Sequence, residues 1–198
     1  TRPGARGSIG TEFVARAAPD GYTIGQGNFT SMSTTRILLA KLPYDPDRDL
    51  QPLIITYLSR NMLAINMALP ISSVPELIAY AKRNPRTLMY GSSAVGSSMH
   101  FSGALFGLMA GVEMVHVPYK TAQAAITDII AGQIHLMFDN IQSIRPHVKA
   151  GRLRGLAVTS LDRTAAFPDL PSVSEAGVEG FELTPWAGPV LRRILEEY

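Results

Sequence analysis

Apolar residues follow two alternating patterns along the chain. Continuous apolar runs bounded by turn residues predict strands, at 22–25, 53–55, 62–66, 88–90, 114–117, 134–138 and 153–159. Segments with apolar residues at helical spacing predict helices, at 34–40, 73–84, 99–110, 122–131 and 144–150. Short strands that alternate with helices are typical of βαβ units with parallel sheets, so the pattern predicts an α/β fold.

Two segments have the sequence of a capping box. In Ser73-Val74-Pro75-Glu76 and again in Ser172-Val173-Ser174-Glu175, a serine precedes a glutamate by three positions. The serine hydroxyl and the glutamate carboxylate are expected to accept hydrogen bonds from N–H groups that the first helical turn leaves unpaired.

The composition is that of a turn-rich globular protein. Residues are 46% apolar and 17% charged, which is too hydrophobic for intrinsic disorder, and the 17 glycines and 14 prolines predict many turns. With a formal net charge of +2 and no basic run longer than Arg192-Arg193, the chain lacks the charge pattern of a nucleic-acid-binding protein.

Cysteine is absent from the sequence, which excludes disulfides, thiolate metal sites and cysteine nucleophiles and fits a compartment where free thiols are a liability. The stretch 87–112 has no charged residue, but its serines and glycines are too polar and too helix-breaking for a membrane span. We therefore expect a soluble protein that is not itself embedded in a membrane.

The most informative loop lies at 91–100, between a predicted strand and a predicted helix. It offers the hydroxyl groups of Ser92, Ser93, Ser97 and Ser98, and a helix start attracts anions through its dipole and its unpaired N–H groups. Ser97 stands where a phosphate-binding loop carries lysine, so a carboxylate suits the loop better than a nucleotide. The alternative is that Ser97 or Ser98 only caps the helix.

Other polar residues follow predicted strands and are further candidates. Ligands of parallel sheets bind beyond the carboxyl ends of the strands. The residues in question are Asn28, Thr30 and Ser31 after the first strand, His100 one helical step beyond Ser97-Ser98, Tyr119 after 114–117, and Asp139 after 134–138. The loop around Asn28 has an ordinary loop composition, and Asp139 has the alternative role of capping the next helix or orienting a neighbouring loop.

Catalytic and metal motifs are missing from the sequence. There is no G-x-S-x-G, no H-E-x-x-H and no complete dinucleotide fingerprint, and the four histidines lack metal-ligand spacing. His116 and His135 are expected to be hydrogen-bonded sheet residues. We therefore expect no enzyme, no cofactor and no metal. Two alternatives stay open: an α/β enzyme with His100 and Asp139 as acid and base, and a ligand-sensing regulatory domain.

A set of ordered segments, spread over about residues 2–188, has a familiar sequence; they lie at 17–23, 41–46, 90–93, 115–120, 137–140, 156–160 and 168–177. Together these segments resemble the Bug family, the substrate-binding proteins of tripartite tricarboxylate transporters. It implies a bacterial periplasmic receptor with a periplasmic-binding-protein-like, two-lobe α/β fold, with parallel-rich sheets and flanking helices. Lobe one would comprise 1–63 plus 187–198, and lobe two 64–186.

The resemblance also implies a ligand and a partner. The ligand would be a di- or tricarboxylate or an acidic amino acid, captured between the lobes by the loops at 27–31, 92–98 and 119–120 and by Asp139. The partner would be the membrane subunits of the transporter. Compared with the family, we expect a chain truncated at both ends, lacking a first strand and most of a C-terminal segment, with Arg6 and Thr121 at positions where glycine is usual. Exposed sheet edges and apolar surface, marginal stability or self-association would follow.

Overall fold

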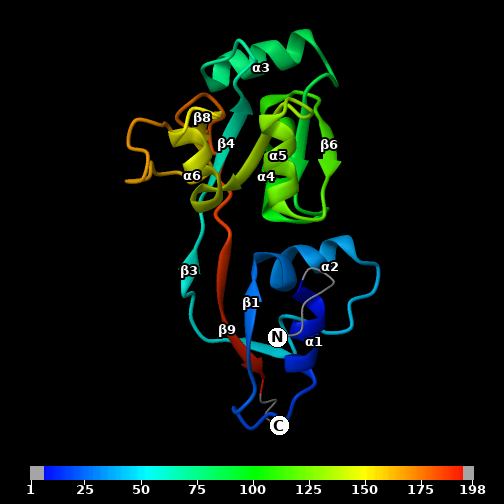
Figure 1. The fold of residues 1–198 in the computed structure, drawn as a ribbon. Helices are drawn as coiled ribbons and strands as arrows, with labels where there is room; N and C mark the ends of the chain where they lie inside the picture. The colour runs from blue at the N-terminus through cyan, green and yellow to red at the C-terminus, as the bar shows by residue number, and fades with distance from the viewer. Residues whose placement is uncertain (1–6, 194–198) are drawn as a thin grey trace. The chain divides into compact units, whose positions relative to one another are not determined.

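Residues 7–193 are described by the computed structural model, and their contacts divide the chain into two units (Figure 1). Unit 1 comprises Thr1–Leu58 and Pro185–Tyr198, and unit 2 comprises Ser59–Thr184. The chain thus crosses between units a few residues earlier than the predicted 63/64 and 186/187. The reason is that β4 (Asn61–Asn66) pairs along its length with strands of unit 2. Arg6, which stands where the resembled family usually has glycine, lies outside the described residues.

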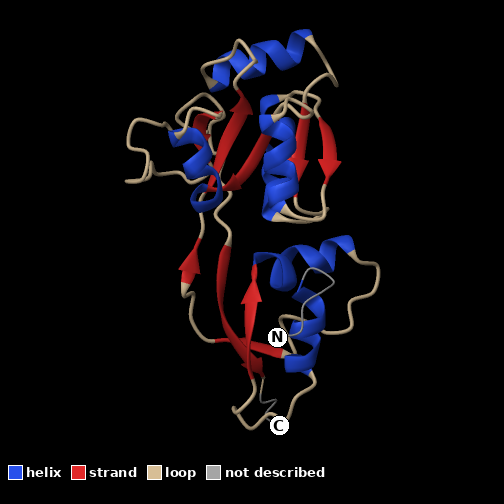
Figure 2. Ribbon diagram, viewed as in Figure 1, coloured by secondary structure: helices blue, strands red, loops and turns tan. Residues whose placement is uncertain are grey.

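Unit 2 is built on a five-stranded mixed sheet of order β6-β5-β7-β4-β8 (Figure 2). Besides β4, its strands are β5 (Met89–Ser92), β6 (Val115–Pro118), β7 (Leu136–Asn140) and β8 (Leu153–Val158). β5 runs parallel to β6 and β7, as the alternating pattern predicts. β4 is antiparallel to both β7 and β8. The α/β fold class is confirmed.

Helices cover both faces of this sheet. They are α3 (Val74–Arg83), α4 (Ser98–Ala110), α5 (Ala122–Ile130) and α6 (Ile141–Lys149). Alternate residues of β4 enter two different cores: Leu63 packs in the cluster of α3 and α4, and Met62 in the cluster of α5 and α6. Because side chains alternate across a strand and both faces are covered, the whole of β4 is buried.

Unit 1 has a small antiparallel sheet. β9 (Trp186–Arg192) pairs with β1 (Ile24–Asn28) on one side and with β2 (Leu50–Pro52) and β3 (Tyr57–Leu58) on the other. The remaining elements are α1 (Ser8–Ala15), the π-helical η2 (Thr30–Thr34) and α2 (Thr35–Leu38). Its buried cluster consists of Val14, Ala15, Tyr44, Leu50 and Val190.

The apolar run 53–55 is not a strand, contrary to the prediction. Leu53, Ile54 and Ile55 are all exposed, and this segment lies against β9 at Gly188. A Cβ at Gly188 would overlap the Ile54 carbonyl oxygen, so this backbone approach requires glycine. The exposed apolar surface expected for lobe one is therefore present, while self-association stays a prediction.

Both segments form capping hydrogen bonds, but each differs from the prediction in one respect. Ser172 and Glu175 bond reciprocally, through Ser172 N–H to the carboxylate at 2.9 Å and Glu175 N–H to the hydroxyl at 3.1 Å, but they begin a turn segment and not a helix. Ser73 caps α3 by accepting the Glu76 N–H. The Glu76 carboxylate binds the N–H and hydroxyl of Ser72, one residue before the expected one.

Within 7–193, no helix has the length and apolarity needed to cross a membrane.

Candidate functional site

Three of the predicted loops meet at one edge of the unit 2 sheet. Because β5, β6 and β7 are parallel, their carboxyl ends lie together, and the segments after Ser92, Pro118 and Asn140 share that edge. β4 is antiparallel, so it begins at the same edge with Asn61. The fold thus brings together the predicted ligand residues Ser92, Ser93, Ser97, Ser98, His100, Tyr119 and Asp139.

Two of the four loop serines hold the loop itself. Ser97 is the N-cap of α4: its hydroxyl accepts the His100 N–H at 3.3 Å and donates to the Ala94 carbonyl at 2.9 Å. The capping alternative is therefore right for Ser97. Ser92 is completely buried, and its hydroxyl lies 3.0 Å from the Ala94 carbonyl and 2.7 Å from Nε2 of His116.

The other two serines are available to a ligand. The hydroxyl groups of Ser93 and Ser98 are half-buried and make no hydrogen bond within the part of the chain that the structure describes. The N–H groups of Ser98 and Met99 lie in the first turn of α4, where the helix has no backbone acceptor for them. Hydroxyl and N–H donors at a helix start can together pair the oxygens of a carboxylate.

A cluster of aromatic and imidazole rings supports this loop from behind. Nδ1 of His100 accepts the Gly96 N–H at 3.2 Å, and the ring centroids of His100 and His116 are 4.2 Å apart. Tyr90 packs on His116 at 4.9 Å. Burial, together with His100, lowers the pKa of His116 to about 4, so both the geometry and the charge state suit a neutral supporting residue.

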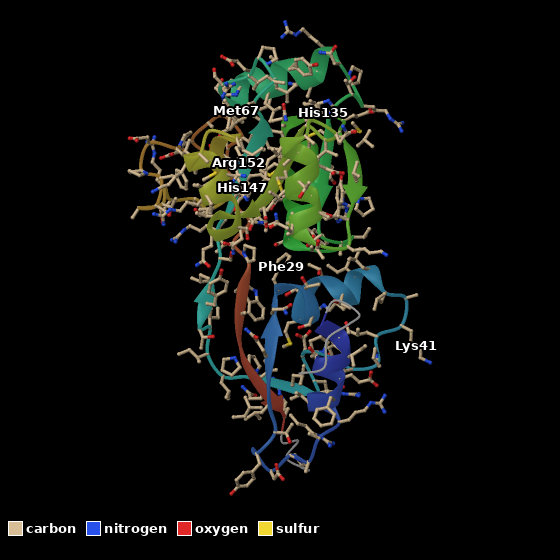
Figure 3. The ribbon with its side chains drawn as sticks, in the orientation of Figure 1. Phe29, Lys41, Met67, His135, His147 and Arg152 are labelled. Atoms are coloured by element: carbon tan, nitrogen blue, oxygen red, sulfur yellow. The ribbon has the colours of Figure 1, made fainter. Side chains whose placement is uncertain are left out.

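The histidines do not form a metal site. His116 bonds to Ser92, and Nδ1 of His135 accepts the Met89 N–H at 3.1 Å, so both are hydrogen-bonded residues of the sheet region as expected. His135 and His147 lie apart in Figure 3. Across residues 7–193 no three His, Cys, Asp or Glu side chains are grouped as metal ligands.

Asp139 is buried near the carboxyl end of β7, with 4% of its surface exposed. Its Oδ1 accepts the N–H of Asn140 at 2.7 Å, and its Oδ2 has no partner among the described residues. Burial raises the pKa of Asp139 to about 6, although the Asn140 N–H lowers it. Asp139 does not cap α6; that role belongs to Asn140, whose Oδ1 accepts the Gln142 N–H at 2.8 Å.

Tyr119 joins the loop to α5. Its N–H donates to the Ser92 carbonyl, and its hydroxyl donates to Oδ2 of Asp128, both at 2.8 Å. Burial and Asp128 raise the Tyr119 pKa to about 12. The phenol proton is thus used within unit 2. Thr121, at the position where the resembled family usually has glycine, caps α5 by accepting the Ala124 N–H at 3.2 Å.

The predicted loop of unit 1 closes on itself after β1. Oδ1 of Asn28 accepts the N–H groups of Thr30 and Ser31, both at 2.9 Å, and the Asn28 N–H donates to the buried Ser31 hydroxyl at 3.3 Å. Figure 3 marks the position of this loop by its residue Phe29. Asn28 and Ser31 therefore shape the turn, and the half-buried Thr30 side chain lies at the start of η2.

Further polar residues at the unit 2 edge have no local sequence signal. The Asn61 N–H donates to the Thr159 hydroxyl at 3.1 Å, and its side-chain amide lies 3.4 Å from the Ser102 hydroxyl. The Asn140 amide donates to Ser59. All but the half-buried Asn140 are buried. Their partners are distant in sequence, so only the tertiary structure reveals the network.

The sequence matches a family model described as "Tripartite tricarboxylate transporter family receptor" over residues 1–192. The UPF0065 protein in the tcbD-tcbE intergenic region of Pseudomonas sp. (strain P51) is 36% identical over 188 residues, 94% of this chain and 56% of that protein. Protein BugT of Bordetella pertussis is 32% identical over 186 residues, 93% of this chain and 57% of that protein. The chain thus spans little more than half the length of these relatives.

Solved structures give the same likeness. R. palustris Rpa4515 with adipate has a TM-score of 0.87 at 39% identity, over 97% of this chain and 64% of that one. Periplasmic binding protein BugD has a TM-score of 0.82 at 31% identity, over 96% and 63%. MatC from Rhodopseudomonas palustris with bound malate has a TM-score of 0.82 at 27% identity, over 96% and 65%.

Proposed function

Because the chain belongs to the tripartite tricarboxylate transporter receptor family, we propose that it binds a small organic carboxylate where α4 begins in unit 2. The proposed ligand is a di- or tricarboxylate or an acidic amino acid. Two similar proteins of known structure are described with adipate and with malate, which are both dicarboxylates. BugD is described as a periplasmic binding protein. This likeness supports the proposal of a periplasmic receptor whose partner is the membrane subunits of a transporter.

The observation that carries the proposal is that two of the loop serines are hydrogen-bonded within the fold, while the hydroxyls of the other two are not bonded among the described residues. Ser92 and Ser97 are used by the fold, while the hydroxyls of Ser93 and Ser98 and the first N–H groups of α4 are available. These neutral donors would pair the carboxylate oxygens, aided by the positive end of the dipole of a 13-residue helix.

Of the residues predicted in unit 1, the half-buried Asn28 and Thr30 stay in the proposal as a second group of polar contacts, whereas the Ser31 hydroxyl is buried and bonded within the turn. α2 and η2, of four and five residues, are too short to offer a helix dipole of their own, so this loop would contribute side-chain donors. That it acts on the same ligand as unit 2 is an implication of the family resemblance. Catalysis by His100 and Asp139 finds less support, because the acceptor nitrogen of His100 is used by Gly96.

Calorimetric titration of Ser93→Ala and Ser98→Ala with adipate, malate, tricarboxylates and acidic amino acids tests the proposal. Each variant removes one hydrogen bond to a charged group, worth about 1.5–3 kcal/mol, so we expect roughly a 10- to 150-fold loss of affinity. Thr87→Val is the matched control, because Thr87 is exposed just before β5 and so lies at the opposite edge of the sheet.

Unchanged affinity in folded Ser93→Ala and Ser98→Ala would show that the carboxylate binds elsewhere. If the wild-type chain binds none of these anions, the proposed function itself is wrong.

A further inference from the structure

Oδ2 of Asp139 is a buried carboxyl oxygen without a partner in the described part of the chain. The side chain is 96% buried, because only 4% of its surface is exposed, and Oδ1 alone is hydrogen-bonded. Leaving a buried carboxyl oxygen unpaired costs the full desolvation penalty of the group, so buried polar groups nearly always have a partner. Oδ2 therefore needs a partner from outside the described part of the chain.

Asp139 lies at the level of the proposed anion loop. In the parallel pair of β5 and β7, Gly91 stands opposite Met137. β7 continues to Asp139 two residues later, and the neighbouring β5 ends at Ser92, where the loop that contains Ser93 begins. On the other side Asp139 stands opposite Met62, which belongs to the apolar cluster of α5 and α6. The carboxyl group is thus desolvated by the core, and it lies on the strand next to the one that leads into the 91–100 loop.

Among residues 7–193, no cation compensates this carboxyl group. The elements packed against β7 carry the titratable residues Tyr90, His100, Asp128, Arg145, His147 and Lys149, and Arg60 directly precedes β4. None of them is among the groups that shift the Asp139 pKa, which burial raises and only the Asn140 N–H lowers. With no positive partner, burial favours the protonated acid.

We infer that Asp139 binds the ligand as a proton carrier: it takes a proton from solvent when the anion binds and donates a hydrogen bond from Oδ2 to a ligand carboxylate oxygen. The inference rests on the proposed function and adds the form in which the ligand is held. An acid–carboxylate pair is a short charge-assisted hydrogen bond. It satisfies the buried oxygen and one ligand oxygen without placing two negative charges side by side.

This arrangement couples affinity to pH. An anion beside Asp139 raises its pKa further, so the bound state retains the proton at pH values where the unliganded protein has lost it. Since the pKa without ligand is about 6, affinity falls as pH rises above that value. Affinity can fall by at most roughly tenfold per pH unit, because one proton is taken up for each ligand bound.

The test is calorimetric titration with adipate and with malate from about pH 6 to about pH 8, in two buffers that differ in protonation enthalpy. For the wild-type chain we expect proton uptake that approaches one per ligand toward the upper end of this range, with affinity falling in parallel. In Asp139→Asn the amide is a permanent donor, so we expect no proton uptake and an affinity that does not change with pH. Asp169→Asn is the matched control, because Asp169 is an exposed carboxylate of the same unit, and it should behave as wild type.

Binding by the wild-type chain without proton uptake would overturn this inference and leave the proposed function standing, and this measurement needs no variant. Uptake that persists in Asp139→Asn would assign the proton to another group and overturn the inference as well. If the wild-type chain binds no di- or tricarboxylate or acidic amino acid, both proposals fall together.

Discussion

The serines of the 91–100 loop have two different roles, supporting the loop and offering donors to the proposed ligand. The sequence alone does not distinguish these roles. Ser92, Ser93, Ser97 and Ser98 are equivalent in sequence, yet the hydroxyls of Ser92 and Ser97 bind atoms of the protein, and those of the other two make no hydrogen bond among residues 7–193. Ser97 is bonded because it caps α4, and Ser92 because His116 reaches it from a neighbouring strand 24 residues away. Serines that support the loop and serines of the proposed ligand site thus alternate along the chain.

At this scale we expect acid to destabilise the loop through His116. The folded chain holds its pKa at about 4, below the ordinary 6.5, so the unfolded chain binds the proton first as pH falls. The stability from this group is complete above about pH 6.5 and is lost as pH falls toward 4. Asp139 has the opposite sign: its raised pKa favours folding at low pH, and this contribution is lost as pH rises through about 6.

The variant His116→Gln isolates the histidine, because its amide can keep the hydrogen bond to Ser92. The Tm difference between wild type and variant, measured by thermal unfolding at a series of pH values, should favour wild type least at acid pH. Contributions from Asp139 are common to both proteins and cancel in the difference. A difference that is constant over the acid range would contradict the lowered pKa of His116.

At the scale of elements, the sequence predicts best where a helix has its own start signal. The helix predicted at 73–84 is found at Val74–Arg83, and the one predicted at 99–110 at Ser98–Ala110. α1 is not predicted, because it is eight residues long, has no side-chain cap and leaves Phe13 exposed. Its stability comes from tertiary packing, in which Val14 fits against Gly25 of β1.

Strand pairing shows the same dependence on tertiary structure. The parallel core of unit 2 follows from the alternation of strands and helices. β4 and β9 lie in different sheets, and each forms antiparallel pairs with strands far along the chain: β4 with β7 and β8, and β9 with β1. The ligand edge was predictable as a set of loops after strands, whereas the contacts of Asn61 with Thr159 and Ser102 were not, because nothing local marks them.

Variants of two neighbouring serines distinguish the stability of α4 from the proposed anion binding at its first turn. Ser97→Ala removes the N-cap, so we expect it to lower the free energy of unfolding by about 1 kcal/mol. Ser98→Ala removes a hydroxyl that makes no hydrogen bond within the described residues and should leave stability nearly unchanged while weakening anion binding. Urea unfolding of both variants checks this. An equal loss of stability in the two would mean that Ser98 also supports the helix.

At the scale of the whole molecule, the two units differ in how much apolar surface they bury. Unit 2 has two large clusters, one on each face of its sheet, which include Phe106 and Phe138 on one face and Met137 on the other. The described part of unit 1 has one cluster of five buried residues and leaves Leu53, Ile54, Ile55, Tyr57 and Leu58 exposed. Because burial of apolar surface is the main favourable term in folding, unit 1 has the smaller driving force.

We therefore expect unit 1 to unfold before unit 2, and the single tryptophan makes this measurable. Trp186 begins β9 in unit 1, so its fluorescence reports that unit, whereas far-UV circular dichroism is dominated by the helices of unit 2. Gly188→Ala places a Cβ against the Ile54 carbonyl oxygen and should lower the temperature of the fluorescence transition alone. Leu77→Ala empties a fully buried position of unit 2, at a cost of about 2–5 kcal/mol, and should lower the dichroism transition alone. If either variant shifts both transitions together, the chain unfolds as one cooperative body, and the exposed apolar face of unit 1 is then stabilised by more than its own small core.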